Sequence, residues 1–74
     1  MNILEHIRQI SKKLNLKSSI QEYRYYIVVQ NNKVEMILVK SNKNLVSELG
    51  YFHNEDDCKM VINKYQREVL ECIG

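Results

Sequence analysis

The side chains best suited to covalent or metal chemistry are two cysteines and two histidines. Cys58 and Cys72 are fourteen positions apart in a segment whose apolar spacing predicts one helix, so their Cα atoms should lie about 21 Å apart. A disulfide joins Cα atoms less than about 7 Å apart. We therefore expect two free thiols that pack as small hydrophobes on the apolar stripe of that helix. The alternatives are a disulfide between two molecules and a redox or metal role.

Neither histidine has a partner at metal-ligand spacing, so the pattern predicts no zinc site. We expect His53 to be a solvated loop residue, with a contact to Cys58 as the alternative. The available hydroxyl nucleophiles are Ser11, Ser18, Ser19, Ser41 and Ser47. None of them stands in an activating context, and two glycines cannot form a phosphate-binding loop. The sequence therefore predicts a protein that is not an enzyme and that uses neither metal nor cofactor.

The chain length of 74 residues predicts one small domain that spans residues 1–74. Its first element should be a helix from Ile3 to Asn15, because apolar residues recur there at helical spacing after an N-terminal cap at Asn2. No apolar run approaches the ~20 residues that cross a bilayer. We therefore expect no membrane association, and the free thiols favour a reducing, cytoplasmic setting.

Residues 23–40 have the composition of a β-hairpin, with Asn31-Asn32 at its turn. This turn predicts a register that separates the side chains onto two faces. The inner face is apolar throughout and comprises Tyr25, Ile27, Val29, Val34, Met36 and Leu38. The outer face comprises Arg24, Tyr26, Val28, Glu35, Ile37 and Val39.

The remaining segment predicts a third strand and a second helix. We interpret Leu45–Phe52 as a strand bulged at Gly50, with a helical turn over Leu45–Leu49 as the alternative. Asn54 should cap the second helix, whose apolar stripe runs from Cys58 to Ile73. The predicted fold is α+β, a two-layer sandwich in the order helix, three-stranded antiparallel sheet, helix.

Two helices on the inner face would leave the outer face of the hairpin open to solvent. The outer face is unusually apolar for a solvent-exposed sheet face. One interpretation is that β-branched residues there reflect strand propensity alone. The other is a contact patch for a partner protein, with Tyr26 exposed at its centre and a homodimer as a further use of the same patch. We take the second interpretation as the working hypothesis.

Charge supplies the competing hypothesis, because residues 1–44 carry eight cations and three carboxylates whereas residues 45–74 carry three and six. A basic first half suggests a nucleic-acid-binding or transcriptional accessory module. Its contact residues would be Lys12, Lys13, Lys17, Lys33 and Lys40, together with Arg24 of the sheet. The lysines near the end of the first helix also suit the negative end of the helix dipole, which is a purely structural explanation for them.

Two parts of the chain resemble known families. The order of elements resembles double-stranded-RNA-binding domains, but Asn54-Glu55-Asp56-Asp57 stands where those domains begin their second helix with lysines, so RNA binding is not implied. The segment Leu49-Gly50-Tyr51-Phe52 and the acidic helix start that follows it resemble AP2-type and integrase-arm DNA-binding domains. That resemblance implies DNA contact through the sheet, for which Arg24, Tyr26, Lys33 and Lys40 are available.

The whole chain also resembles small accessory proteins of phages and mobile elements, some of which are anti-CRISPR inhibitors. Met1-Asn2-Ile3 and Ile7-Arg8-Gln9-Ile10 are similar to the first helix of one such inhibitor. That inhibitor is strongly acidic and mimics DNA, whereas this chain has a net charge of +2. The resemblance therefore implies an inhibitor that occludes a host protein, and it does not extend to DNA mimicry.

Overall fold

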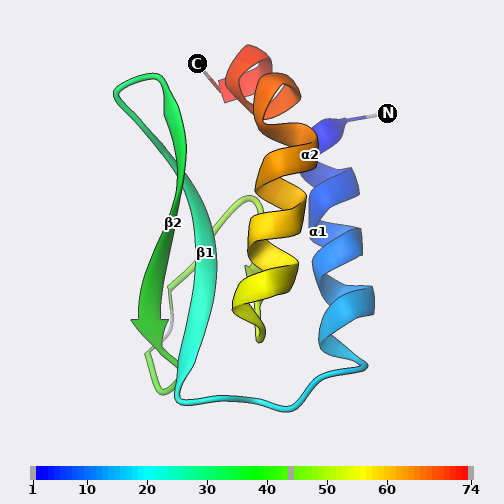
Figure 1. The fold of residues 1–74 in the computed structure, drawn as a ribbon, viewed down its shortest axis with the longest axis vertical. Helices are drawn as coiled ribbons and strands as arrows, with labels where there is room; N and C mark the ends of the chain where they lie inside the picture. Colours follow the sequence, from blue (N-terminus) through cyan, green and yellow to red (C-terminus); the bar gives the residue numbers. More distant parts are fainter. Residues whose placement is uncertain (1, 44, 74) are drawn as a thin grey trace.

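The computed structural model describes residues 2–43 and 45–73 and has the predicted element order. Helix α1 (Ile3–Asn15) is followed by strands β1 (Tyr23–Gln30), β2 (Lys33–Lys40) and β3 (Tyr51–Phe52), and then by helix α2 (Glu55–Ile73). The two helices lie side by side on one side of the strands (Figure 1). This confirms the prediction of an α+β fold with a three-stranded antiparallel sheet.

Helix α1 begins and ends where the sequence predicts. The side chain of Asn2 accepts a hydrogen bond from the backbone N–H of Leu4 at 2.9 Å, which satisfies one of the donors that a helix leaves free in its first turn. The apolar stripe turns inward and buries Ile7 completely. Lys12 and Lys13 occupy the last turn, where the helix dipole favours cations.

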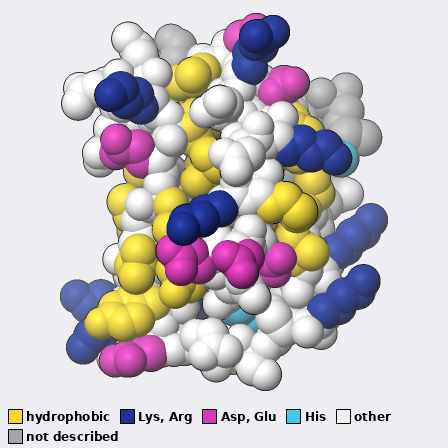
Figure 2. Space-filling view, in the orientation of Figure 1, with side chains coloured by type: hydrophobic (Ala, Val, Ile, Leu, Met, Phe, Trp, Pro, Cys, Tyr) yellow, Lys and Arg dark blue, Asp and Glu magenta, His cyan; other side chains and the backbone are white. Residues whose placement is uncertain are grey.

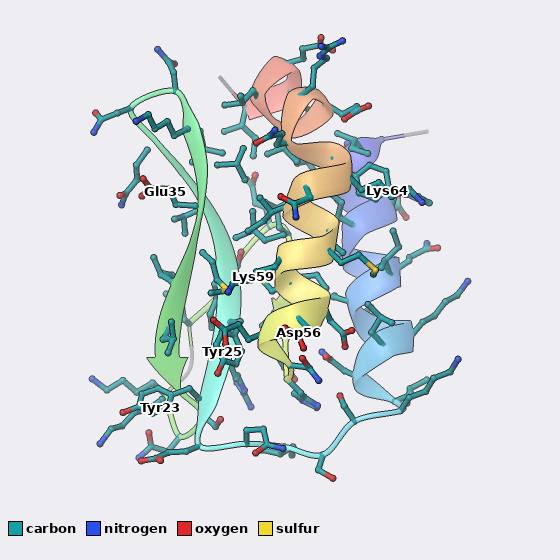
Figure 3. The ribbon with its side chains drawn as sticks, in the orientation of Figure 1. Tyr23, Tyr25, Glu35, Asp56, Lys59 and Lys64 are labelled. Carbon is teal, nitrogen blue, oxygen red and sulfur yellow. The ribbon has the colours of Figure 1, made fainter. Side chains whose placement is uncertain are left out.

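The hairpin forms because both turn residues adopt a backbone conformation that asparagine tolerates. Asn31 and Asn32 have φ angles of 52° and 60°, as a two-residue turn of this kind requires. The resulting register pairs Val29 with Val34 and continues to the far end of both strands, as predicted. Figure 3 shows the consequence: Tyr25 lies on the side towards α2, and Glu35 points away from the helices.

The third strand is much shorter than predicted. It contains only Tyr51 and Phe52, whereas the sequence suggested a strand over Leu45–Phe52 or a helical turn over Leu45–Leu49. A tight turn replaces both, because Gly50 donates its N–H to the carbonyl of Ser47 at 3.2 Å and has a φ of +76°. The chain enters β3 directly from this turn.

The strand order is β2-β1-β3, so β1 is the central strand. The connection from β2 to β3 must therefore cross β1 to reach its other edge, and its described residues, 41–43 and 45–50, pass behind the strands in the view of Figure 1. We call these residues the crossing connection. Its position determines how much of the outer face remains open.

The two edges of the sheet differ in their protection. At the β3 edge, the side-chain amide of Asn15 donates to the carbonyl of Tyr51 at 2.8 Å and accepts the N–H of His53 at 3.0 Å. One side chain of α1 thus satisfies the backbone groups that a further strand would otherwise bind. The β2 edge is eight residues long and lies at the outer margin of the molecule (Figure 1).

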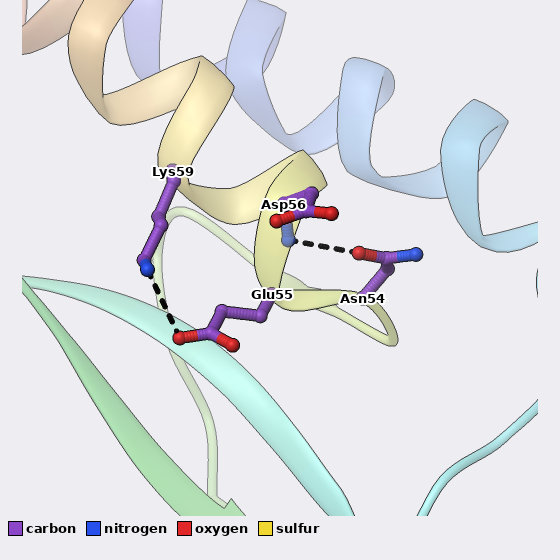
Figure 4. Close-up of polar contacts among 4 residues, drawn as sticks. All are labelled: Asn54, Glu55, Asp56 and Lys59. Carbon is purple, nitrogen blue, oxygen red and sulfur yellow. Dashed lines mark hydrogen bonds and ion pairs between the residues drawn. The ribbon is translucent and has the colours of Figure 1, made fainter.

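Helix α2 begins with the predicted cap. Figure 4 shows the side-chain oxygen of Asn54 accepting the N–H of Asp56 at 2.8 Å, and an ion pair of 3.1 Å between Lys59 and Glu55 one turn apart. The ion pair is exposed and contributes at most a few tenths of a kcal/mol. Three carboxylates in the first turn face the positive end of the helix dipole, and Figure 2 shows them gathered over the start of α2.

The core lies between the inner face of the sheet and the two helices. Its buried members are Ile7, Ile27, Leu49, Phe52, Cys58, Val61 and Val69. Leu49 belongs to the crossing connection, and its buried side chain anchors the connection to the core immediately before β3. No helix among the described residues is long and apolar enough to cross a bilayer.

Candidate functional site

The predicted outer face exists as one face of the hairpin. Arg24 pairs with Val39, Tyr26 with Ile37 and Val28 with Glu35, and opposed residues of antiparallel strands share a face. None of the six predicted contact residues belongs to the core cluster. The structure therefore brings all six together on the side of the sheet opposite the helices.

Tyr26 is buried, so the expectation that it would be exposed is wrong. Only 1% of its surface remains accessible, because the crossing connection lies over it. Its hydroxyl donates to the carbonyl of Leu45 at 3.3 Å, and its ring centroid lies 5.9 Å from that of Tyr51. The chain thus covers the centre of its own outer face with a loop.

Tyr51 is the residue of this face that sequence reasoning missed. It pairs with Tyr26 across β1 and β3, which places its ring on the outer side. The guanidinium carbon of Arg24 lies 4.4 Å from the centre of this ring, a cation–π contact. The Nε atom of Arg24 is buried without a hydrogen-bond partner among the described residues. Arg24 is therefore held against its own sheet and is less available to a partner than predicted.

The open part of the outer face is displaced towards β2 and the crossing connection. Val28, Ile37 and Val39 are half-buried, and Glu35 is exposed at their margin. The connection adds two apolar side chains that are strongly exposed, Leu45 at 43% and Val46 at 95%. We call this surface the outer patch; its members are Val28, Ile37, Val39, Leu45 and Val46. The last two could have been recognised as adjacent apolar residues within an otherwise polar segment.

The lysines of the nucleic-acid hypothesis do not form one surface. Lys12, Lys13 and Lys17 lie at the end of α1, and Lys40 lies at the same end of the molecule (Figure 1). Lys33 begins β2 and stands at the opposite end, next to the hairpin turn. At about 3.4 Å per residue, the length of the strand separates Lys33 from Lys40 by more than 20 Å.

A groove of about 530 Å³ lies between α1 and β3, a volume typical of small-molecule sites. It is lined by Arg8, Ser11, Lys12, Asn15, Leu16, Gly50, Tyr51 and His53. The two cations are one helical turn apart, and no described carboxylate is among the lining residues, so its electrostatics favour an anion. Arg8 was missed from the sequence, although its spacing of four residues from Lys12 could have indicated a shared face.

His53 is buried, which corrects its interpretation as a solvated loop residue. Only 9% of its surface is accessible, and its Nδ1 lies 3.4 Å from both the hydroxyl and the carbonyl oxygen of Ser18. His6 contacts the hydroxyl of Tyr65 through Nε2 at 3.2 Å. Within residues 2–43 and 45–73, no three histidine, cysteine or acidic side chains are placed to share a metal ion.

The two cysteines are free and differ sharply in their environment. Cys58 is buried in the core as predicted, and burial, followed by the nearby carboxylate of Glu55, raises the pKa of its thiol to about 12. Cys72 is exposed, which corrects its placement on the buried stripe. It lies in the last turn of α2, which has 19 residues against the 13 of α1.

We expect iodoacetamide at neutral pH to alkylate Cys72 and leave Cys58 unmodified in the native protein. The thiolate is the form that reacts. At Cys58 the raised pKa keeps the thiolate fraction very low at neutral pH, and burial keeps the reagent away from the sulfur. Peptide mass spectrometry after timed labelling measures each site, and labelling in urea is the control that should modify both. Similar native labelling rates at the two sites would contradict the buried environment of Cys58.

Comparisons with protein-family models, with curated proteins and with solved structures find no match to this chain.

Proposed function

We propose that the protein is a non-enzymatic binding protein that occludes a partner protein through the outer patch. The observation that carries this proposal is the crossing connection, which covers Tyr26 and exposes Leu45 and Val46 on the same side of the sheet as the half-buried aliphatic residues of β1 and β2. Contiguous exposed apolar side chains are normally occupied in soluble proteins. An apolar centre with a charged margin, here Glu35, is also the usual composition of a protein interface.

The way in which the crossing connection is anchored supports the same role. The connection is held to the sheet by the Tyr26 hydroxyl and to the core by Leu49. Its exposed side chains therefore stand on a segment fixed at two points, which lowers the entropy lost when a partner binds. The resemblance of the first helix to phage inhibitors gives the proposal its specific form: a phage or mobile-element inhibitor that acts on a host protein in the bacterial cytoplasm.

Changing Val46 to aspartate should weaken partner binding by at least about tenfold, because a carboxylate would be desolvated against an apolar surface. Val46 is 95% exposed, so the variant should unfold at the wild-type urea concentration. Ile37→Asp, made on the strand side of the outer patch, should have the same effect on binding. Each variant is immobilised and compared with wild type for the proteins it retains from a bacterial lysate, and the affinity of any retained protein is then measured.

The matched control is Met60→Asp, which introduces the same charge on an exposed methionine of α2 outside the outer patch. It should retain the wild-type set of proteins. Equal retention by wild type and by both patch variants would refute the proposed surface. If binding persists in all variants but falls steeply with salt, phosphate contacts and the lysine-based nucleic-acid alternative would be favoured instead.

A further inference from the structure

The long edge of the sheet carries backbone groups that no described residue satisfies. A two-residue turn places Gln30 and Lys33 in a pair that exchanges both of its hydrogen bonds. Hydrogen-bonded and non-hydrogen-bonded pairs alternate from there, so Val34, Met36 and Leu38 direct their N–H and carbonyl groups away from β1. Among the described residues, no hydrogen bond to those outward groups is formed.

This edge lacks most of the devices that usually prevent strand pairing and relies on charge alone, at Lys33, Glu35 and Lys40. Such edges are commonly shortened, bulged, interrupted by proline or covered. The chain contains no proline, and the β2 register with β1 is continuous over all eight residues. The opposite edge contrasts with it, because Asn15 closes that edge with two hydrogen bonds. Among the described residues, the outward backbone groups are thus satisfied at the two-residue strand and unpaired at the eight-residue strand.

An apolar side chain on the inner face of β2, the face that packs against the helices, is also exposed. Leu38 lies on the inner face, yet 52% of its surface is accessible. Figure 2 shows hydrophobic side chains reaching the surface over the strands, on the margin away from α1. An exposed strand edge with apolar side chains at its centre is a template for a further strand.

We propose that two copies of this chain pair through β2, antiparallel to each other, to form one six-stranded sheet. Along β2, even-numbered residues lie on the inner face and odd-numbered residues on the outer face. The inner faces of the two copies therefore form one continuous face only when even-numbered residues oppose even-numbered residues. A two-fold axis at Ile37 meets this condition and places Met36 opposite Leu38 of the second copy. The half-exposed leucine is then covered by an apolar side chain on each side of the axis.

The charges on β2 favour this register over axes placed nearer the hairpin turn. An axis at Glu35 would oppose two like carboxylates, and an axis at Met36 would leave them as diagonal neighbours. An axis at Ile37 instead opposes Glu35 to Val39 of the second copy. The occupant of the edge is therefore a second copy of the chain, because the strand pairs with itself in hydrogen bonds and in apolar contacts without opposing like charges. This inference is independent of the outer patch, which lies on a face of the sheet and not on its edge.

The test is the substitution Leu38→Pro. It removes an N–H that points away from β1 and leaves the hydrogen bonds between β1 and β2 in place. Proline is tolerated at such a position because the N–H of an edge strand there faces solvent. Sedimentation velocity should show wild type changing from monomer to dimer over about a hundredfold range of concentration. The variant should dimerise at least about 100-fold more weakly, because the two-fold axis makes each substitution count twice.

Leu38→Lys is the second variant, for use if circular dichroism shows that proline disturbs the monomer. Met60→Lys is the matched control, since Met60 is 51% exposed and lies on α2. It should dimerise as wild type does. Hydrogen exchange gives the site-specific measurement: the amides of Met36 and Leu38 should exchange more slowly as concentration rises. A protein that stays monomeric, or a dimer that survives the Leu38 substitutions, would overturn the proposal.

Discussion

Replacing Tyr26 with alanine is expected to remove a large part of the stability of the protein. The side chain is 1% exposed and packs between the sheet and the crossing connection, so truncation leaves a large cavity. Comparable truncations of buried aromatic residues cost about 3–5 kcal/mol. A domain of this size has a free energy of unfolding of roughly 4–11 kcal/mol. Urea unfolding followed by circular dichroism should show the midpoint falling by at least about a quarter.

Tyr26→Phe is the control that separates packing from hydrogen bonding. It keeps the ring and removes only the O–H that donates to the Leu45 carbonyl, which should cost about 1 kcal/mol. If Tyr26→Ala instead unfolded near the wild-type midpoint, the connection would not cover this face. Tyr26 is therefore unsuitable as a probe of partner binding, because any loss of binding would reflect loss of the fold.

Replacing Gly50 with alanine should destabilise the protein by about 2–3 kcal/mol. The φ of +76° costs an L-residue about 1 kcal/mol or more. The added Cβ would also lie 2.7 Å from the hydroxyl oxygen of Ser11. That hydroxyl is buried and donates to the carbonyl of Arg8 at 2.7 Å, so moving it breaks a hydrogen bond. Thermal unfolding of the variant beside wild type measures the total effect.

The double variant Gly50→Ala with Ser11→Ala separates the two causes. Removing the hydroxyl relieves the steric conflict and leaves the cost of the backbone conformation, so about 1 kcal/mol or more should be recovered. Ser11→Ala alone should be nearly neutral, because alanine is the better helix former. A double variant no more stable than Gly50→Ala would show that contact with Ser11 is not the source of the strain.

The parts of the fold that could be predicted are those determined by local patterns. Helix α1 follows from one cap and one apolar stripe, and the hairpin register follows from two asparagines and strict alternation. In both cases the deciding residues lie within a few positions of each other, where sequence spacing translates directly into geometry. The six hairpin residues of the outer face are a consequence of that register and were predicted with it, whereas Tyr51 of β3 was not.

The parts that could not be predicted depend on contacts between distant segments. Alternation places Tyr26 on the outer face, but only the strand order decides that a later segment crosses over it. His53 is buried by Asn15 and Ser18, which are more than thirty positions away. The short β3 was missed because Leu45 and Val46 have strand-like composition, whereas the turn at Ser47–Gly50 holds them on the surface. The displacement of the outer patch follows from these same contacts.

The double hydrogen bond from Asn15 has a consequence for how the molecule loosens. A two-residue strand has almost no stability of its own, and its free edge is held by a residue in the final turn of α1. Fraying of that turn removes both hydrogen bonds from the outer edge of the strand, and detachment of the strand leaves the side-chain amide of Asn15 without these partners. We therefore expect the openings of these two segments, which are far apart along the chain, to be coupled.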